Sequence, residues 1–332
     1  MHRLLVTGGL GFIGSNFILY VHNHWKSSRI TNLDAVSYGA VPKSLKEIKN
    51  KPRYRFIKGN TADRRLVKKL FSDVDVVVHF AAETHVDRSI ADPESFLRSN
   101  VLGTFALLEA ARRSDIERFV HISTDEVYGS ITTGSFRETD RMEASSPYSA
   151  SKAASDVFVE AYFKTYGLPT VTMRCTNNFG PRQFPEKFIP KAIINAVLGR
   201  KIPVYGSGTQ VRDWIYVLDF CKAIALAVEN GAAGTIYNVC AGNELKNIEV
   251  VKQILRELGK PNDLLQFVED RPGHDFRYSL DSTRIRNQLG WRPEHTFREA
   301  LAETVKWYSE NESWWKPLAT EQILGLTPWK RK

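Results

Sequence analysis

Cysteine is scarce in this chain. Three of the 332 residues are cysteines, Cys175, Cys221 and Cys240, and no two of them form a CxxC pair or have the spacing of metal ligands. A scaffold stabilised by disulfides is therefore excluded, because such scaffolds carry an even set of closely spaced cysteines. The low count fits a reducing compartment, so we predict a cytoplasmic protein without a bound metal.

Long hydrophobic runs are also missing. The apolar stretch at residues 76–82 is far shorter than the roughly 20 residues that span a bilayer, so no membrane partner is predicted. The stretch from Leu4 to Gly14 is mostly apolar, but it holds four glycines in seven residues. It predicts a buried strand and a turn, because a signal peptide has a longer apolar region and a small-residue cleavage site.

Acidic residues are outnumbered by basic ones, 37 to 46, which gives a net charge of +9. Such an excess either attracts polyanions or is a bias of the solvated surface. No block of lysine and arginine occurs before residues 330–332, and the acidic residues are interspersed among the basic ones. Charge alone therefore selects no partner, and nucleic-acid binding is not predicted.

The remaining composition is that of a globular protein, with 42% hydrophobic and 25% charged residues. In the first half, short apolar runs alternate with helical patterns, which is typical of a parallel sheet covered on both faces. The fold class is therefore α/β, a doubly wound Rossmann-type parallel sheet. The predicted strands are residues 3–7, 29–33, 54–58, 75–82, 119–123 and 170–174, and the clearest helices are residues 12–25, 101–113 and 148–166.

A glycine-rich turn follows the first predicted strand. Gly8, Gly11 and Gly14 have GxxGxxG spacing, which permits a tight turn and lets backbone N–H groups approach a pyrophosphate at a helix N-terminus. Asp34 ends the second strand, where a carboxylate accepts hydrogen bonds from a ribose 2′-hydroxyl and repels a 2′-phosphate. This pattern favours NAD over NADP; the alternative is a structural turn with an unrelated surface aspartate.

Tyr148 and Lys152 are four residues apart at the start of a predicted helix, so they share one face. An ammonium beside a phenol stabilises the phenolate, which would lower the tyrosine pKa and make it a base for a substrate hydroxyl. Such a pair is common by chance. A second group supports it: Thr124, Asp125 and Glu126 follow the strand at residues 119–123, at the sheet edge where ligands bind. An adjacent Asp and Glu can act as acid and base, or the turn can merely cap the next helix.

These motifs together resemble the dTDP-glucose 4,6-dehydratases, members of the extended short-chain dehydrogenase/reductase family. The resemblance covers roughly residues 3–310. Beyond the glycine turn and the YxxxK motif, it depends on the sequences at residues 80–89, 123–129, 176–181, 184–187, 210–214, 270–275 and 289–291. The Thr-Asp-Glu triplet is its most specific part, since related epimerases and decarboxylases usually carry other residues there.

The resemblance implies a role for each residue of the triplet and of the YxxxK pair. Tyr148 would be the base at the sugar 4-hydroxyl, with Lys152 as its partner beside the nicotinamide ribose. Thr124 would hydrogen-bond the 4-oxygen. Asp125 would protonate the leaving 6-hydroxyl, and Glu126 would remove the proton at C5.

Binding residues are implied in the same way. NAD would be bound by Gly8, Gly11, Phe12, Ile13, Gly14, Asp34, Asn60, Thr61, Phe80, Ala81, Ala82, Thr84, Ser99, Tyr148, Lys152 and Asn178. The nucleotide sugar would be bound by Thr84, His85, Thr124, Asn177, Lys187, Phe188, Pro203, Tyr205, Arg212, Asn247, Arg271 and His274. One position departs from the family pattern: Asn60 replaces an aspartate that contacts the adenine amino group, although its amide carbonyl can still accept that bond.

The second half of the chain is richer in turns. A strand at residues 212–216 and a helix at residues 219–229 are expected to return to the main sheet. We therefore assign residues 1–174, plus about 211–240, to an NAD-binding domain. Residues 175–210 and 241–332 would form a smaller mixed α/β lobe that binds the nucleotide sugar.

The function that the resemblance implies is dehydration of dTDP-glucose to dTDP-4-keto-6-deoxyglucose, catalysed by a homodimeric NAD-dependent lyase. The alternatives are a UDP-glucose 4,6-dehydratase, another sugar-nucleotide epimerase or dehydratase, and a cofactor-sensing protein on the same fold. An epimerase needs no acid–base pair at C5 and C6, and a sensor would be expected to lack the catalytic residues. The remaining strand histidines, His79 and His121, are predicted to be core residues with satisfied nitrogens.

Overall fold

The computed structural model describes residues 2–270 and 274–325. Its main element is a seven-stranded parallel sheet in the order β10-β6-β5-β4-β1-β2-β3. The predicted Rossmann-type fold is therefore confirmed. The strands are β1 (Arg3–Thr7), β2 (Arg29–Asp34), β3 (Tyr54–Lys58), β4 (Val76–His79), β5 (Arg118–Thr124), β6 (Thr170–Cys175) and β10 (Thr235–Val239).

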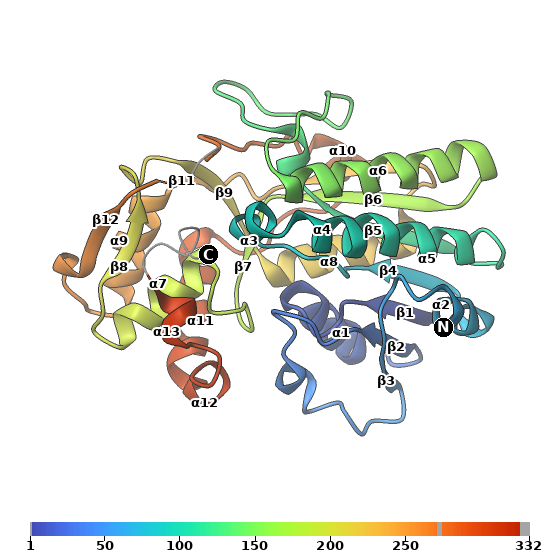
Figure 1. Cartoon of the computed structure of the whole chain (residues 1–332), viewed down its shortest axis with the longest axis horizontal. Helices are drawn as coiled ribbons and strands as arrows, with labels where there is room; N and C mark the ends of the chain where they lie inside the picture. Colours follow the sequence, from blue (N-terminus) through green and yellow to red (C-terminus); the bar gives the residue numbers. More distant parts are fainter. Residues whose placement is uncertain (1, 271–273, 326–332) are drawn as a thin grey trace.

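Helices cover both faces of this sheet (Figure 1). On one face, α2 (Arg64–Leu70), α5 (Gly103–Ala111) and α6 (Pro147–Tyr166) pack on a core that includes Leu5, Val77 and Phe119. On the other, α1 (Phe12–His24) and α8 (Val217–Asn230) pack on a core that continues into the second lobe. Central strands buried on both sides explain why their sequences are continuously apolar.

The predicted helix at residues 101–113 begins earlier in the structure. It is continuous with α4 (Pro93–Phe96) and with a π-helical segment, η3 (Leu97–Leu102), before α5. Asn100 lies in this segment, and its side chain bonds the backbone N–H and carbonyl of Glu83 and the hydroxyl of Ser151. The irregular turn thus joins the loop after β4 to α6.

The strand predicted at residues 212–216 does not return to the main sheet. It is β9 (Val211–Tyr216), the centre of a three-stranded sheet with β7 (Asn177–Phe179) and β11 (Glu244–Lys246). The helix predicted after it does return, as α8, and the seventh strand of the main sheet is β10. β9 is buried and carries Arg212 and Asp213 among apolar residues, and this pattern alone could not reveal which strands it pairs with.

The second lobe lies to the left in Figure 1. Besides the three-stranded sheet, it contains a separate two-stranded parallel sheet of β8 (Ile202–Tyr205) and β12 (Leu265–Val268). Trp314 and Trp315, near the C-terminus, are buried, which agrees with packing rather than a binding role. Its helices are α7 (Phe188–Val197), α9 (Asn247–Glu257), α11 (Phe297–Glu310), α12 (Glu312–Trp315) and α13 (Glu321–Leu324), whereas α10 (Thr283–Leu289) packs on β10 and α8 of the main domain.

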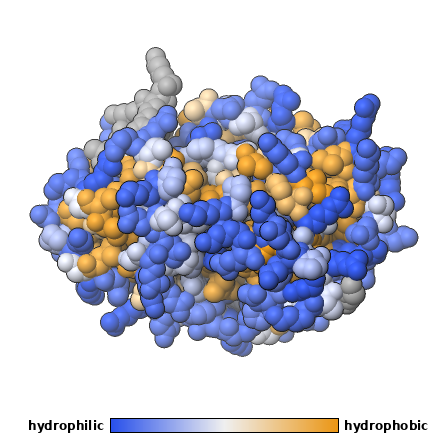
Figure 2. Space-filling view, turned by 90° about the horizontal axis from the view of Figure 1, so that it is seen from below, coloured by the Kyte–Doolittle hydropathy of each residue, from blue (hydrophilic) through white to orange (hydrophobic). Residues whose placement is uncertain are grey.

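The remaining short elements lie in connections: α3 (Val86–Ala91), η1 (Pro42–Leu45), η2 (Phe71–Asp73), η4 (Asp125–Tyr128) and η5 (Asn262–Leu264). Hydrophilic side chains predominate on the face shown in Figure 2, where apolar side chains form two separate areas. Among the described residues, no helix has the length and apolar character needed to cross a bilayer.

Candidate active site

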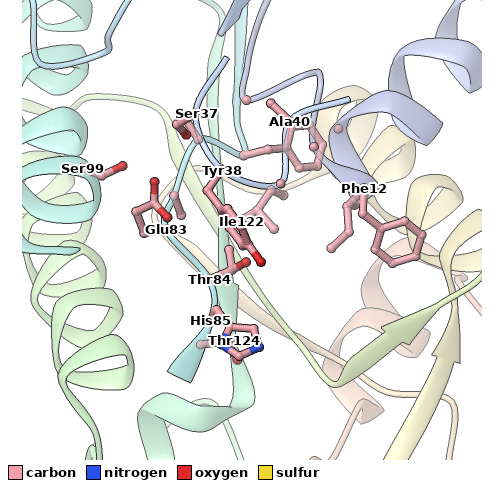
Figure 3. A pocket seen from close by; sticks show the side chains of 18 of the residues that line it. Phe12, Ser37, Tyr38, Ala40, Glu83, Thr84, His85, Ser99, Ile122 and Thr124 are labelled. Carbon is pink, nitrogen blue, oxygen red and sulfur yellow. The ribbon is translucent and has the colours of Figure 1, made fainter. Parts of the chain in front are cut away.

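A cavity of about 460 Å³ lies at the carboxyl ends of the main strands, and a second of about 190 Å³ adjoins it toward the smaller lobe. Residues such as Thr84, Glu126 and Asn177 line both cavities, so the two form one continuous cleft. In Figure 3, Thr84, His85 and Thr124 lie toward one end of the larger cavity, and Ser37 and Ser99 toward the other. An open α/β sheet binds ligands at this edge.

The glycine turn is constrained by close backbone contacts. Gly8 has φ of +69°, and a Cβ there would lie 2.6 Å from the backbone of Ala81. A Cβ on Gly14 would lie 2.5 Å from the carbonyl oxygen of Gly8. Helix α1 begins after Gly11 with no side-chain cap and no acidic residue in its first turn. Its first N–H groups thus point to a site suited to an anion such as a pyrophosphate.

Asp34 is positioned by the same turn. Its carboxylate accepts hydrogen bonds from the backbone N–H of Leu10 at 2.9 Å and of Val36 at 2.8 Å. Burial raises the pKa of Asp34, and these two bonds offset part of that rise. Each oxygen keeps a lone pair for a ribose hydroxyl. In the turn after the neighbouring strand β3, the side-chain carbonyl of Asn60 already accepts a hydrogen bond from the backbone N–H of Ala62 at 2.8 Å.

The Thr-Asp-Glu triplet forms the turn η4 at the end of β5. Asp125 is 3% exposed, and burial, reinforced by the neighbouring Glu126, raises its pKa to about 8. One of its oxygens accepts a hydrogen bond from the Thr124 hydroxyl at 3.1 Å, while the other has no hydrogen-bond partner among the described residues. A carboxyl group in this state is protonated at neutral pH and can donate a proton.

The electrostatics of Tyr148 differ from the prediction. We expected Lys152 to lower its pKa, but burial first, and then Glu126, raises the pKa of Tyr148 well above its ordinary value. A hydrogen bond with Thr124 offsets part of this rise. The Lys152 ammonium instead donates to the carbonyl of Ile122 at 2.7 Å. The phenol is therefore neutral in this arrangement.

The second cavity collects the residues predicted to bind the nucleotide sugar. Arg271 lies outside the described residues. Thr124 lines the first cavity. The others line the second: Thr84, His85, Asn177, Lys187, Phe188, Pro203, Tyr205, Arg212, Asn247 and His274.

Arg212 is a buried cation of this cavity, as is Lys191, yet much of the Arg212 guanidinium is already bonded. It donates to the carbonyls of Val211 and Asp275 at 2.8 Å and of Phe276 at 3.2 Å, and it lies 4.3 Å from the Tyr278 ring centroid. Of its five N–H donors these bonds use three, so two remain for a ligand. Arg212 therefore fixes the segment after residue 274 as well as facing the cavity.

The side-chain oxygens of Asn177 and Asn178 indicate that the cleft binds a polar ligand. The Oδ1 atoms of Asn177 and Asn178 are buried and have no hydrogen-bond partner within the described part of the chain. Both residues line both cavities. Because buried polar atoms are nearly always bonded, these atoms fit a cleft that is completed by polar ligands.

A family model described as GDP-mannose 4,6 dehydratase matches residues 5–304. The chain belongs to this family. It is 48% identical over 320 residues to the dTDP-glucose 4,6-dehydratase of Streptomyces niveus, covering 95% of each chain.

Solved structures show the same relation. The dTDP-glucose 4,6-dehydratase DesIV of Streptomyces venezuelae, solved with NAD bound, is 46% identical, with a TM-score of 0.93 and coverage of 95% of this chain and 99% of that one. The UDP-glucose 4-epimerase of Thermus thermophilus, also solved with NAD, is 31% identical, with a TM-score of 0.86 and coverage of 93% and 99%. Since dehydratases and epimerases share this fold, the chemistry must be argued from the site.

One group of residues at the cleft, around Tyr38, was not predicted from the sequence. Tyr38, in the loop after β2, lies edge-on to Phe184 at 5.2 Å and has the Arg88 guanidinium 3.8 Å from its ring centroid. Burial and a hydrogen bond with Glu186 raise the pKa of Tyr38. These contacts join the two lobes across the mouth of the larger cavity. The aromatic residue four positions after Asp34 was the only local signal.

Proposed function

We propose that this enzyme dehydrates dTDP-glucose to dTDP-4-keto-6-deoxyglucose as an NAD-dependent hydro-lyase. One observation carries the proposal: Asp125, buried so that its pKa rises to about 8, adjoins Glu126 in the same cavity as Tyr148 and Lys152. Elimination of water across C5 and C6 needs an acid and a base together. Exchange of configuration at C4 needs a base at the 4-hydroxyl but no acid–base pair at C5 and C6, so the pair favours dehydration over epimerisation.

The residues of the larger cavity fit NAD. The uncapped start of α1 suits the pyrophosphate, the Asp34 carboxylate suits an unphosphorylated ribose, and Asn178 offers an unpaired oxygen. We assign the glycine turn, Asp34, the loop after β4 and Lys152 to cofactor binding. When bound, NAD supplies a positively charged ring and the acceptor and donor of the hydride.

Each protein group then has a proposed task. Tyr148 would take the proton of the 4-hydroxyl as a phenolate, a form that the Lys152 ammonium and the positively charged ring of bound NAD would favour over the neutral phenol. Thr124 bonds the 4-oxygen. The ketone that forms at C4 acidifies the hydrogen at C5, which Glu126 removes. Asp125 gives its proton to the departing C6 oxygen. Water is lost only after the C4 oxidation, because the C5 proton is not acidic before it.

The nucleotide diphosphate is assigned to the second cavity and thereby to the smaller lobe. Lys187, which donates to the carbonyl of Thr84 at 2.8 Å, lies where the two cavities meet. With Arg212 it supplies cationic donors for the phosphates, and charge-assisted bonds of this kind are strong and directional.

We expect the purified enzyme to convert dTDP-glucose faster than UDP-glucose and to carry NAD. Both nucleotide sugars should be assayed side by side by release of the 4-keto product, and the bound nucleotide should be extracted and identified by mass. Faster turnover of UDP-glucose would transfer the proposal to the UDP sugar. Formation of a 4-epimer without a 4-keto product would reject dehydration, and extracted NADP would reject the role of Asp34.

We also propose that the chain forms a homodimer in the cytoplasm. Helix α6 and the η3–α5 segment expose large apolar side chains, namely Leu97, Leu102, Val157, Phe158 and Tyr166, and such a patch favours a protein partner. The buried free cysteines suit a reducing compartment. Sedimentation should give twice the chain mass of 37.7 kDa, and Val157→Glu should reduce it to the monomer mass. A monomeric wild type would contradict the dimer.

A further inference from the structure

Asp156, one helical turn after Lys152 on α6, forms a buried ion pair with Arg174, and the reaction outlined above gives this pair no role. Asp156 is 3% exposed. Its Oδ2 accepts a hydrogen bond from Arg174 Nε at 2.8 Å, and its Oδ1 lies 3.2 Å from His121 Nε2. Arg174 is on β6 and His121 on β5, so the pair is enclosed by α6 and the sheet.

Arg174 extends this cluster to the acidic turn. It donates to the Tyr128 hydroxyl at 2.6 Å and lies 4.8 Å from the centroid of that ring. Tyr128 is the last residue of η4, the turn that carries Asp125 and Glu126, and it donates in turn to Asn238 on β10 at 2.9 Å. A continuous polar path thus joins the lysine's helix to the turn that carries the acid–base pair.

The other titratable groups around Lys152 are neutral. Burial lowers the pKa of His79 on β4 well below its ordinary value, and burial, with Lys152 next, lowers the pKa of His121 to about 4. The thiol of Cys175 on β6 and the phenols of Tyr148 and Tyr128 have pKa values raised by burial. Asp156 and Arg174 are therefore the charged residues of this cluster, and the Asp156 carboxylate is the one that raises the pKa of Lys152.

Two opposing effects, burial and the Asp156 carboxylate, set the pKa of Lys152. Burial lowers its pKa to about 8, and Asp156 is the main group that opposes this fall. Burial would raise the pKa of Asp156, but His121, Arg174 and Lys152 together lower it to about 2, so the carboxylate keeps its charge at working pH. We predicted that both strand histidines have satisfied ring nitrogens. This holds for His79, which bonds Thr7 and Thr104. It fails for His121: Nε2 only approaches the Asp156 carboxylate at 3.2 Å, and neither nitrogen makes a hydrogen bond among the described residues.

We propose that Asp156 is a positioning residue for Lys152, and that its carboxylate, held by Arg174 and flanked by neutral His121, keeps the lysine protonated beneath the cofactor site. The proposal deepens the proposed function, because it relies on the role given there to Lys152. Removing the anion withdraws the charge that raises the pKa of Lys152, so loss of the lysine proton is favoured. It also leaves the buried Arg174 without its counter-ion. A purely structural ion pair would support the fold without controlling that proton.

The deciding experiment measures the lysine directly. The enzyme, as purified with its nucleotide, is labelled with ¹³C at lysine Cε, and the Lys152 resonance is identified by its absence from Lys152→Met. Asp156→Asn should lower the titration midpoint of this resonance by on the order of one pH unit. Asp156→Glu, which keeps the charge, should retain the wild-type midpoint. Tyr128→Phe, which breaks the same path without altering a charge, should also retain it.

Turnover provides a second readout. Since Asp125 titrates in the same range as Lys152, kcat is compared at two pH values rather than by its alkaline limb alone. The ratio of wild-type to Asp156→Asn kcat should grow several-fold between about pH 6.5 and pH 8, as expected for earlier loss of an essential proton. For Tyr128→Phe the ratio should stay constant.

An unchanged midpoint in Asp156→Asn would overturn the proposal, as would an equal shift in Tyr128→Phe. If Asp156→Asn does not fold, Arg174→Gln tests the same point with the opposite sign. It keeps the Asp156 carboxylate and removes the cation, so the titration midpoint of the Lys152 resonance should rise. An unchanged or lower midpoint there would also overturn the proposal. A wild type that converts no nucleotide sugar would reject the proposed function, while the resonance would still decide whether Asp156 controls the charge of Lys152.

Discussion

Glu126→Gln should nearly abolish product formation while leaving oxidation at C4 intact. Glutamine keeps the shape of the side chain but cannot accept the C5 proton, so elimination should slow by roughly 10²–10⁴-fold, the usual contribution of a general base. Tyr148 and Lys152 remain in place, and the 4-keto hexose intermediate should therefore accumulate. Rapid-quench analysis of sugar species would show this shift from product to intermediate.

Solvent exchange gives an independent measure of the same step. In heavy water the wild type should place deuterium at C5, because the base that removes this proton returns one from solvent, and Glu126→Gln should lose this exchange together with elimination. Glu310→Gln makes the same substitution on an exposed side chain of α11 and should behave as wild type. A normal rate with normal C5 exchange in Glu126→Gln would disprove its assignment as the base.

The fold was largely predictable because its central strands are buried on both faces. β1 and β4 are mostly apolar, and β5 and β6 are buried almost throughout although they also carry polar residues. The glycine turn after β1 restricts the chain to one local geometry. The pairing of β9 was not predictable. Its residues suit either sheet, and the choice depends on β7 and β11, which are short and separated from it in sequence.

The site was predictable in its members but not in its charges. Local motifs placed Tyr148, Lys152 and the triplet at one sheet edge, and the family resemblance that they indicated is confirmed. The spacing of Tyr148 and Lys152 could not show that burial and Glu126 would dominate the phenol. The bonds of Arg212 to residues 275 and 276 were equally hidden, because they join segments more than 60 residues apart.

Asp125→Asn should change activity and stability in opposite directions. Asparagine cannot donate the proton that the C6 oxygen needs, so loss of water should slow by roughly 10²–10⁴-fold while the 4-keto intermediate still forms. Stability should rise above about pH 4, since the buried wild-type carboxyl holds a proton that it would release on unfolding, or else ionises in a buried site. Its pKa is about 8 in the folded protein against 3.8 ordinarily, so between these values the folded state binds more protons than the unfolded state.

The sign of the pH dependence follows from this difference in proton binding. Wild-type stability is lost as the pH rises from about 4 to about 8, and Asp125→Asn escapes that loss because its amide does not titrate. The variant's advantage in the free energy of unfolding should therefore widen by a few kcal/mol between about pH 5 and pH 8, as measured by denaturant titration. Asp75→Asn is the matched control: hydrogen bonding with Arg3 lowers the pKa of Asp75, so removing that charge should destabilise the protein over the same range. An Asp125→Asn variant with no gain at pH 8 would show that Asp125 does not carry a raised pKa, and a normal dehydration rate would remove it as the acid.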